Sequence, residues 1–76
     1  MQVDLIGTTF IVDKEDGMFL LYHDIFPLGG CGKTFTEAYH DLVQTVIELR
    51  YGFSGKMDEY SLDGMRFAEF LRELDV

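Results

Sequence analysis

Apolar residues recur at three- and four-residue spacing in the middle of this chain, directly after a glycine-rich turn. This spacing places them on one side of a helix and predicts a helix over residues 35–51. Thr34 can cap its first turn, because its hydroxyl can accept from the amide of Glu37 and the Glu37 carboxylate can accept from the amide of Thr34. Gly52 is expected to end the helix. The apolar side consists of Phe35, Ala38, Tyr39, Leu42, Val43, Val46, Ile47 and Leu49.

The residues before this helix have the character of strands. β-Branched and aromatic residues predict a first strand over residues 5–13, in which Gly7 is expected to mark a bulge or a bend. An Asp-Gly pair at 16–17 predicts a hairpin turn into a second strand over residues 18–22. That strand is apolar throughout, which is typical of a central strand covered on one face by the helix and on the other by a partner subunit or the C-terminal segment. Residues 28–33 are expected to form a short third strand.

The residues after the long helix predict a second, shorter helix. Residues 57–60 are compatible with a short edge strand, and Ser61 or Asp63 can cap a helix that ends near Leu74. The apolar side of this helix consists of Leu62, Met65, Phe67, Phe70, Leu71 and Leu74.

These elements predict an α+β protein. A three-stranded antiparallel sheet, with a fourth short strand as an open alternative, is covered by one long helix and followed by a C-terminal helix. We expect a single domain over residues 1–76, with a core over residues 3–52 and a C-terminal helical segment over residues 57–76.

The length and the cysteine content narrow the class of protein. A chain of 76 residues is near the lower end of what folds alone, and a homodimer or a higher homo-oligomer would hide leftover apolar surface. One cysteine allows no internal disulfide and fits a reducing cytoplasm. No apolar run approaches the roughly 20 residues that span a bilayer. We therefore expect a cytoplasmic protein without a membrane span.

The charge balance bears on the partners of this protein. Fourteen Asp and Glu against six Lys and Arg give a formal net charge of −8, so direct binding of nucleic acid would work against long-range repulsion. The acidity can serve solubility alone, or it can attract a basic protein. The charge by itself does not separate these two explanations.

Gly32-Lys33-Thr34 between a strand and a helix resembles part of a phosphate-binding loop. The complete motif has another glycine five residues before Gly32, where this chain has Pro27. Because proline has no amide to offer to a phosphate, nucleotide binding is disfavoured and no cofactor is expected.

Neither a catalytic set nor a metal-binding set can be assembled from the sequence. Cys31 with His23 and Asp24 could form a thiol nucleophile's triad, but a cysteine in a tight turn is the favoured interpretation. His23 and His40 lack partners at metal-ligand spacing. The acidic residues around the hairpin could attract a divalent cation, although a solvated turn is favoured. We expect a protein that is not an enzyme. The acidic residues are Asp13, Glu15, Asp16 and Asp24.

Three features together resemble the HicB antitoxin family. The first is a hairpin with an Asp-Gly-x-aromatic turn, here Asp16 to Phe19, and the second is a proline connection followed by Gly30-Cys31. The third and most specific is Gly32-Lys33-Thr34-Phe35-Thr36-Glu37-Ala38, which opens the helix. The resemblance covers roughly residues 8 to 51.

The resemblance implies a partial ribonuclease-H-like fold without nuclease catalysis. It further implies a homo-oligomeric inhibitor that blocks a small basic RNA-cleaving toxin of the HicA-like kind. The chain departs from the family in the turn after Pro27 and in having a short acidic segment after the helix instead of a DNA-binding domain. The alternative is a stand-alone structural or regulatory homo-oligomer with no toxin partner. The candidates for contact with a partner are Asp13, Glu15, Asp16, Asp24 and Pro27.

Overall fold

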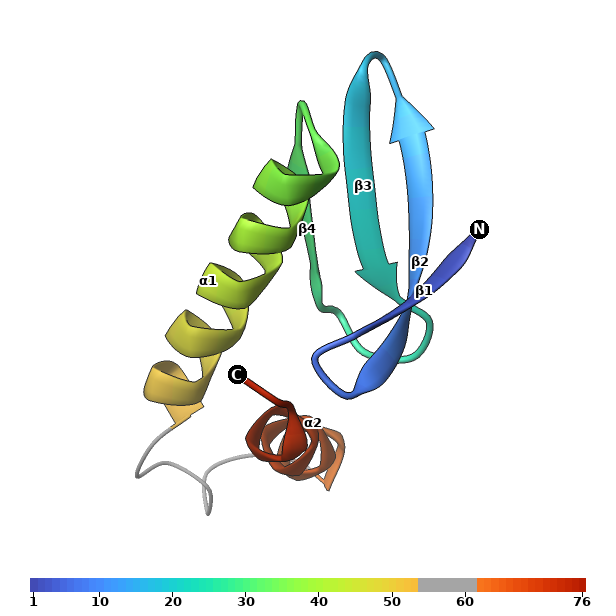
Figure 1. The fold of residues 1–76 in the computed structure, drawn as a ribbon. Coiled ribbons are helices and arrows are strands. Elements are labelled where there is room, and N and C mark those ends of the chain that lie inside the picture. The colour runs from blue at the N-terminus through green and yellow to red at the C-terminus, as the bar shows by residue number, and fades with distance from the viewer. Residues whose placement is uncertain (54–61) are drawn as a thin grey trace.

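The computed structural model describes residues 1–53 and 62–76, which form one four-stranded sheet and two helices (Figure 1). The sheet is antiparallel, and its strand order β1-β2-β3-β4 follows the sequence. The predicted α+β class, with a long helix after the strands and a shorter C-terminal helix, is confirmed. The elements are β1 (Gln2–Leu5), β2 (Thr8–Glu15), β3 (Met18–His23), β4 (Gly29–Gly32), α1 (Phe35–Phe53) and α2 (Leu62–Glu73).

The fourth strand is β1, at the N-terminal end of the chain. The predicted first strand is in fact two strands, joined by a tight turn in which Ile6 has a φ of 47° and Gly7 a φ of 88°. Two consecutive positive φ angles are the signature of a type I′ hairpin turn, so of the bulge or bend expected at Gly7 the bulge is wrong, and the bend is a full reversal of the chain. A β-branched residue rarely adopts this conformation, which is why the sequence pattern concealed the turn. The segment 57–60, considered for a fourth strand, and the cap residue Ser61 lie outside the described residues.

The buried side chain of Ile6 explains how this turn is held. Ile6 is only 8% exposed and belongs to the hydrophobic core, and its carbonyl oxygen accepts a hydrogen bond of 3.0 Å from the amide of Asp75. The strained turn is therefore fixed from both sides, by the core and by the residues that follow α2.

Helix α1 begins where the sequence predicts and ends later. The amide of Glu37 donates to Thr34 Oγ1 at 3.1 Å, as expected of an N-cap. The Glu37 carboxylate accepts from the amide of Lys33 at 2.9 Å, one residue before the expected Thr34. The helix continues through Gly52 to Phe53, so the predicted stop at Gly52 is wrong. Glycine lowers helix propensity by only about 1 kcal/mol and does not by itself end a helix.

Two glycines of β4 let α1 lie directly on the sheet. A Cβ atom on Gly30 would stand 2.5 Å from both the Ala38 carbonyl oxygen and the Leu42 amide nitrogen. A Cβ atom on Gly32 would stand 2.6 Å from the Ala38 amide nitrogen. The sheet and the helix backbone therefore approach each other more closely than any side chain would allow.

Alternate residues of the strands face the helices and form the core. Phe10 and Leu21 of the sheet and Leu42 of α1 are buried almost completely, and the cross-strand pairs that contain Phe10 and Leu21 share the helix side of the sheet. Of the predicted helix face, Ala38 and Val46 are also buried, whereas Ile47 is 48% exposed. The predicted apolar face of α1 is thus correct, except that Ile47 lies at its border and not in the core.

Helix α2 lies on the same side of the sheet as α1 (Figure 1). Its residues Phe67 and Leu71 enter the core that contains Phe10, and Phe70 packs on the His23 ring with centroids 4.7 Å apart. The C-terminal segment therefore does not cover the second face of β3, because α2 lies beside α1, and cover by a partner subunit stays a prediction. We call the uncovered side the open sheet face. It carries Asp4, Ile11, Asp13, Glu15, Leu20 and Tyr22.

Arg50 connects the end of α1 to the end of α2. Its guanidinium donates to the carbonyl oxygens of Leu71 at 2.6 Å, Leu74 at 2.6 Å and Val76 at 2.8 Å. The last carbonyls of a helix have no partner within the helix, so one planar side chain with several donors satisfies α2 from the neighbouring helix.

We expect Arg50→Met to lower the free energy of unfolding by about 2 kcal/mol, because part-buried carbonyls lose charge-assisted partners. Urea unfolding of the variant gives this value. Arg72→Met is the control, since Arg72 is exposed in the last turn of α2, and its effect should stay within about 0.5 kcal/mol. Equal losses in the two variants would contradict the capping role of Arg50.

Candidate functional site

Three of the predicted contact residues lie together at the β2–β3 hairpin. Asp13 and Glu15 are on β2, and Asp16 begins the two-residue turn with a φ of 51°. All three side chains are exposed, and none forms an ion pair with a described residue. The Asp13 carboxylate accepts a hydrogen bond of 2.8 Å from the amide of Lys14. The hairpin thus presents unpaired negative charge to the solvent.

The other two predicted residues, Asp24 and Pro27, lie beyond the far end of β3. The six residues of β3 separate the hairpin turn from Asp24 by about 20 Å, at the usual rise of a strand. The structure therefore does not bring the five predicted contact residues together. It also removes Asp24 from the acidic cluster expected at the hairpin.

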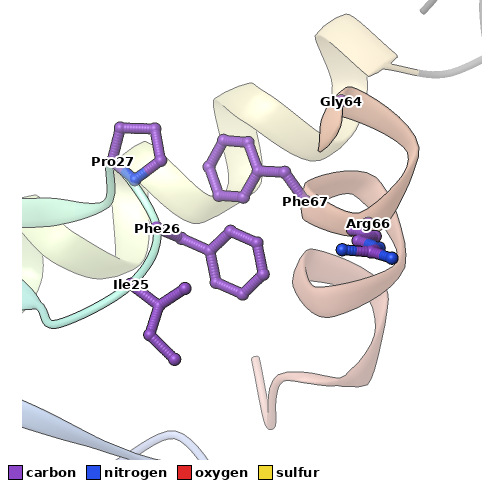
Figure 2. A pocket seen from close by; sticks show the side chains of 6 residues that line it. All are labelled: Ile25, Phe26, Pro27, Gly64, Arg66 and Phe67. Atoms are coloured by element: carbon purple, nitrogen blue, oxygen red, sulfur yellow. The ribbon is translucent and has the colours of Figure 1, made fainter. Parts of the chain in front are cut away.

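Pro27 borders an apolar groove of about 580 Å³ between the β3–β4 connection and α2 (Figure 2). Phe26 stacks on Phe67 with ring centroids 5.4 Å apart and on Phe70 at 4.4 Å. The groove is lined by Ile25, Phe26, Pro27, Gly64, Arg66 and Phe67. This end of the molecule is thus an aromatic surface that includes a cation, unlike the acidic hairpin.

His23 holds the β3–β4 connection in place. Its Nδ1 accepts from the amides of Ile25 at 3.1 Å and Phe26 at 3.2 Å, so the proton of the neutral ring is on Nε2. Nε2 lies 3.3 Å from Thr8 Oγ1 on β2 and can donate to it. The ring also packs edge-on against Phe10. The sequence singled out His23 only as a candidate for chemistry, whereas its three hydrogen bonds are structural.

Burial lowers the pKa of His23 below its usual value, and the nearby negative charge of Asp24 opposes this only in part. A base with a lowered pKa in the folded state binds its proton more readily when unfolded. Its contribution to stability is therefore complete above the unfolded pKa of about 6.5 and is lost as the pH falls towards the folded pKa.

We expect the free energy of unfolding to decrease from about pH 7.5 to about pH 5.5, above the range in which carboxylates usually titrate. The His23→Phe variant should lose this dependence whatever its absolute stability. His40→Gln, at an exposed position of α1, should retain it. Urea unfolding at several pH values measures both, and a slope unchanged by His23→Phe would contradict the assignment.

The thiol triad considered from the sequence does not form. Cys31 is opposite Leu20 on the open sheet face, while His23 is opposite the buried Phe10 on the helix side, so the two side chains point away from each other. At the start of α1, the amides of Lys33 and Glu37 are already bonded to side-chain oxygens, as described above. Two of the backbone donors at this helix start are therefore used within the chain itself.

No family model, curated protein or solved structure matches this chain. The likeness to HicB antitoxins therefore depends on the residues of the β2–β3 turn, the proline connection and the start of α1. Within residues 1–53 and 62–76, no helix is both long enough and apolar enough to cross a membrane.

Proposed function

We propose that this chain is a non-catalytic protein-binding module that binds and neutralises a small basic RNA-cleaving toxin, as the HicB antitoxins that it resembles do. The observation that carries the proposal is the set of exposed, unpaired carboxylates at the β2–β3 hairpin, Asp13, Glu15 and Asp16, in a chain of net charge −8. Such a surface attracts a basic protein over long range and speeds its association.

The proposed binding takes place in the cytoplasm and involves no catalysis by this chain. Cys31 is a free and exposed thiol, as is usual in a reducing compartment. The proposed partner is a protein, and no direct contact with nucleic acid is part of the proposal, because the acidic surface repels phosphate.

A second candidate function is that of a structural or regulatory homo-oligomer with no toxin partner. It is favoured by the apolar side chains on the open sheet face, where Tyr22 is 42% exposed between the half-buried Ile11 and Leu20. A small domain can hide such residues in an interface between copies.

A binding titration separates the two functions. The purified chain is titrated, at low and at high salt, with the small basic protein that the proposal expects to be encoded beside its gene, and the RNA cleavage by that protein is measured in parallel. The proposal expects tight binding that weakens with salt, together with loss of RNA cleavage. Absence of binding at both salt concentrations would contradict it and favour the homo-oligomer.

A further inference from the structure

The open sheet face differs in composition from the rest of the protein surface. Ile11 is directly opposite Tyr22 and Leu20 is opposite Asp13, so the three apolar side chains are neighbours on β2 and β3. None of the three belongs to the hydrophobic core or to the partly buried residues that pack on it. Large apolar side chains that lie together at the middle of an exposed sheet mark an interaction surface.

The charged side chains that the strands place on this face all have one sign. Asp4, Asp13 and Glu15 share the face, and Thr9 Oγ1 holds the Asp4 carboxylate with a hydrogen bond of 2.7 Å. Lys14, the single cation within the four strands, points to the other side, where its Nζ lies 5.3 Å from the centre of the Phe19 ring. The face therefore combines an apolar centre with an acidic border and no strand cation.

We infer that the open sheet face is the docking surface for a protein whose own surface has an apolar centre bordered by lysine and arginine. This inference rests on the proposed function and assigns it a location: the face around Ile11, Leu20 and Tyr22, and not the groove beside Pro27. The groove includes Arg66 in its lining, which does not complement a basic partner.

A second copy of this chain does not complement the face. Two copies stacked face to face would bring the carboxylates of Asp4, Asp13 and Glu15 of both copies into one interface, with no strand cation between them. Like charges in such an interface cost several kcal/mol, whereas a basic border turns the same carboxylates into attractive partners.

The partner docks on the face and not on the β4 edge of the sheet. The amide of Cys31, which would bind an added strand there, donates to Asp41 Oδ2 of α1 at 3.0 Å. The amide of Lys33, just beyond β4, is bonded to Glu37, as described above. Strand addition to this edge is disfavoured because two of its donors already have partners within the chain.

The test uses variants on the face and matched variants elsewhere, titrated with the small basic protein that the proposed function expects to be encoded beside the gene. Tyr22→Thr removes the central ring and keeps a residue suited to a strand. Its control is Tyr51→Ala on α1, where the tyrosine is 85% exposed. We expect Tyr22→Thr to weaken binding at least about tenfold, as loss of a central aromatic residue does, and the control to bind like the wild type. Thermal melts establish that each variant is folded.

The charged border has its own pair of variants. The double variant Asp13→Asn, Glu15→Gln should weaken binding mainly at low salt and flatten its salt dependence. Its control, Asp24→Asn with Glu69→Gln, removes two exposed carboxylates outside the open sheet face and should keep more of the wild-type affinity. Equal effects of the two double variants would indicate attraction by net charge alone and would overturn the assignment of the border.

Cys31 provides an independent measure of where the partner lies. It is the single cysteine of the chain, it is exposed, and it is opposite Leu20 on the open sheet face. Alkylation of Cys31 by iodoacetamide, followed by mass spectrometry of this chain, should slow at least about tenfold when the basic protein is in saturating excess.

The outcomes separate the inference from the function on which it rests. If the wild type binds but Tyr22→Thr binds equally well and Cys31 stays reactive, the docking surface is wrong while the proposed function stands. If the wild type does not bind, the proposed function fails and the inference fails with it. If sedimentation shows a dimer of the wild type that Tyr22→Thr dissociates, a second copy occupies the face and the inference is overturned.

Discussion

Leu42→Ala is expected to lower the free energy of unfolding by about 2–5 kcal/mol, the range found for leucines truncated in a core. The side chain of Leu42 is fully buried between α1 and the sheet, and its backbone lies against Gly30. The backbone contact keeps α1 from moving in to fill the cavity. A domain of this length has a stability of roughly 4–11 kcal/mol, so the loss is a large fraction of the total.

Urea unfolding measures this loss, and Ile47→Ala is its control on the same helix. Ile47 is 48% exposed, so its truncation removes less buried surface and should have an effect below about 1 kcal/mol. The same midpoint for both variants would mean that the side of α1 assigned to the core is wrong.

Gly30→Ala is expected to destabilise the protein by about 3 kcal/mol or more, at the upper end of the range for overpacked cores. The new Cβ would lie 2.5 Å from two backbone atoms of α1, the Ala38 carbonyl oxygen and the Leu42 amide nitrogen. Because those atoms belong to a rigid helix and not to the tip of a flexible side chain, the whole helix has to shift away from β4.

Gly52→Ala is the control for this substitution. Gly52 is within α1, and a Cβ atom there meets nothing within 4 Å. Alanine at a helical position of this kind is expected to be neutral or to stabilise by up to about 1 kcal/mol. Thermal unfolding of the two variants compares them directly, and a stable Gly30→Ala protein would contradict the close approach of β4 and α1.

Local sequence patterns were sufficient to predict the elements that have a strong apolar periodicity or a specific turn. The Asp-Gly turn placed the β2–β3 hairpin, and Thr34 placed the start of α1 at the residue observed. These features depend on hydrogen bonds and φ angles within a few residues, so the sequence contains all that decides them. The α+β class followed from their order.

The positions that were missed depend on contacts between distant residues. Ile6 occupies a turn that its side chain disfavours, because the core buries it and Asp75 binds its carbonyl. Arg50 caps α2 across 21 or more residues of sequence, and nothing in the helix pattern around it predicts that. A prediction from neighbouring residues cannot include such distant partners.

For the candidate binding surface, too, some features follow from the sequence and others from the tertiary structure. The sequence by itself determined the net charge of −8, the exposed hairpin acids and the apolar character of β3. Only the tertiary structure decided that α2 packs beside α1, which leaves Ile11 and Tyr22 on an open face, and that Asp24 lies far from the hairpin. The physical reason is that alternation along a strand defines two faces, whereas the packing of the helices decides which of them is covered.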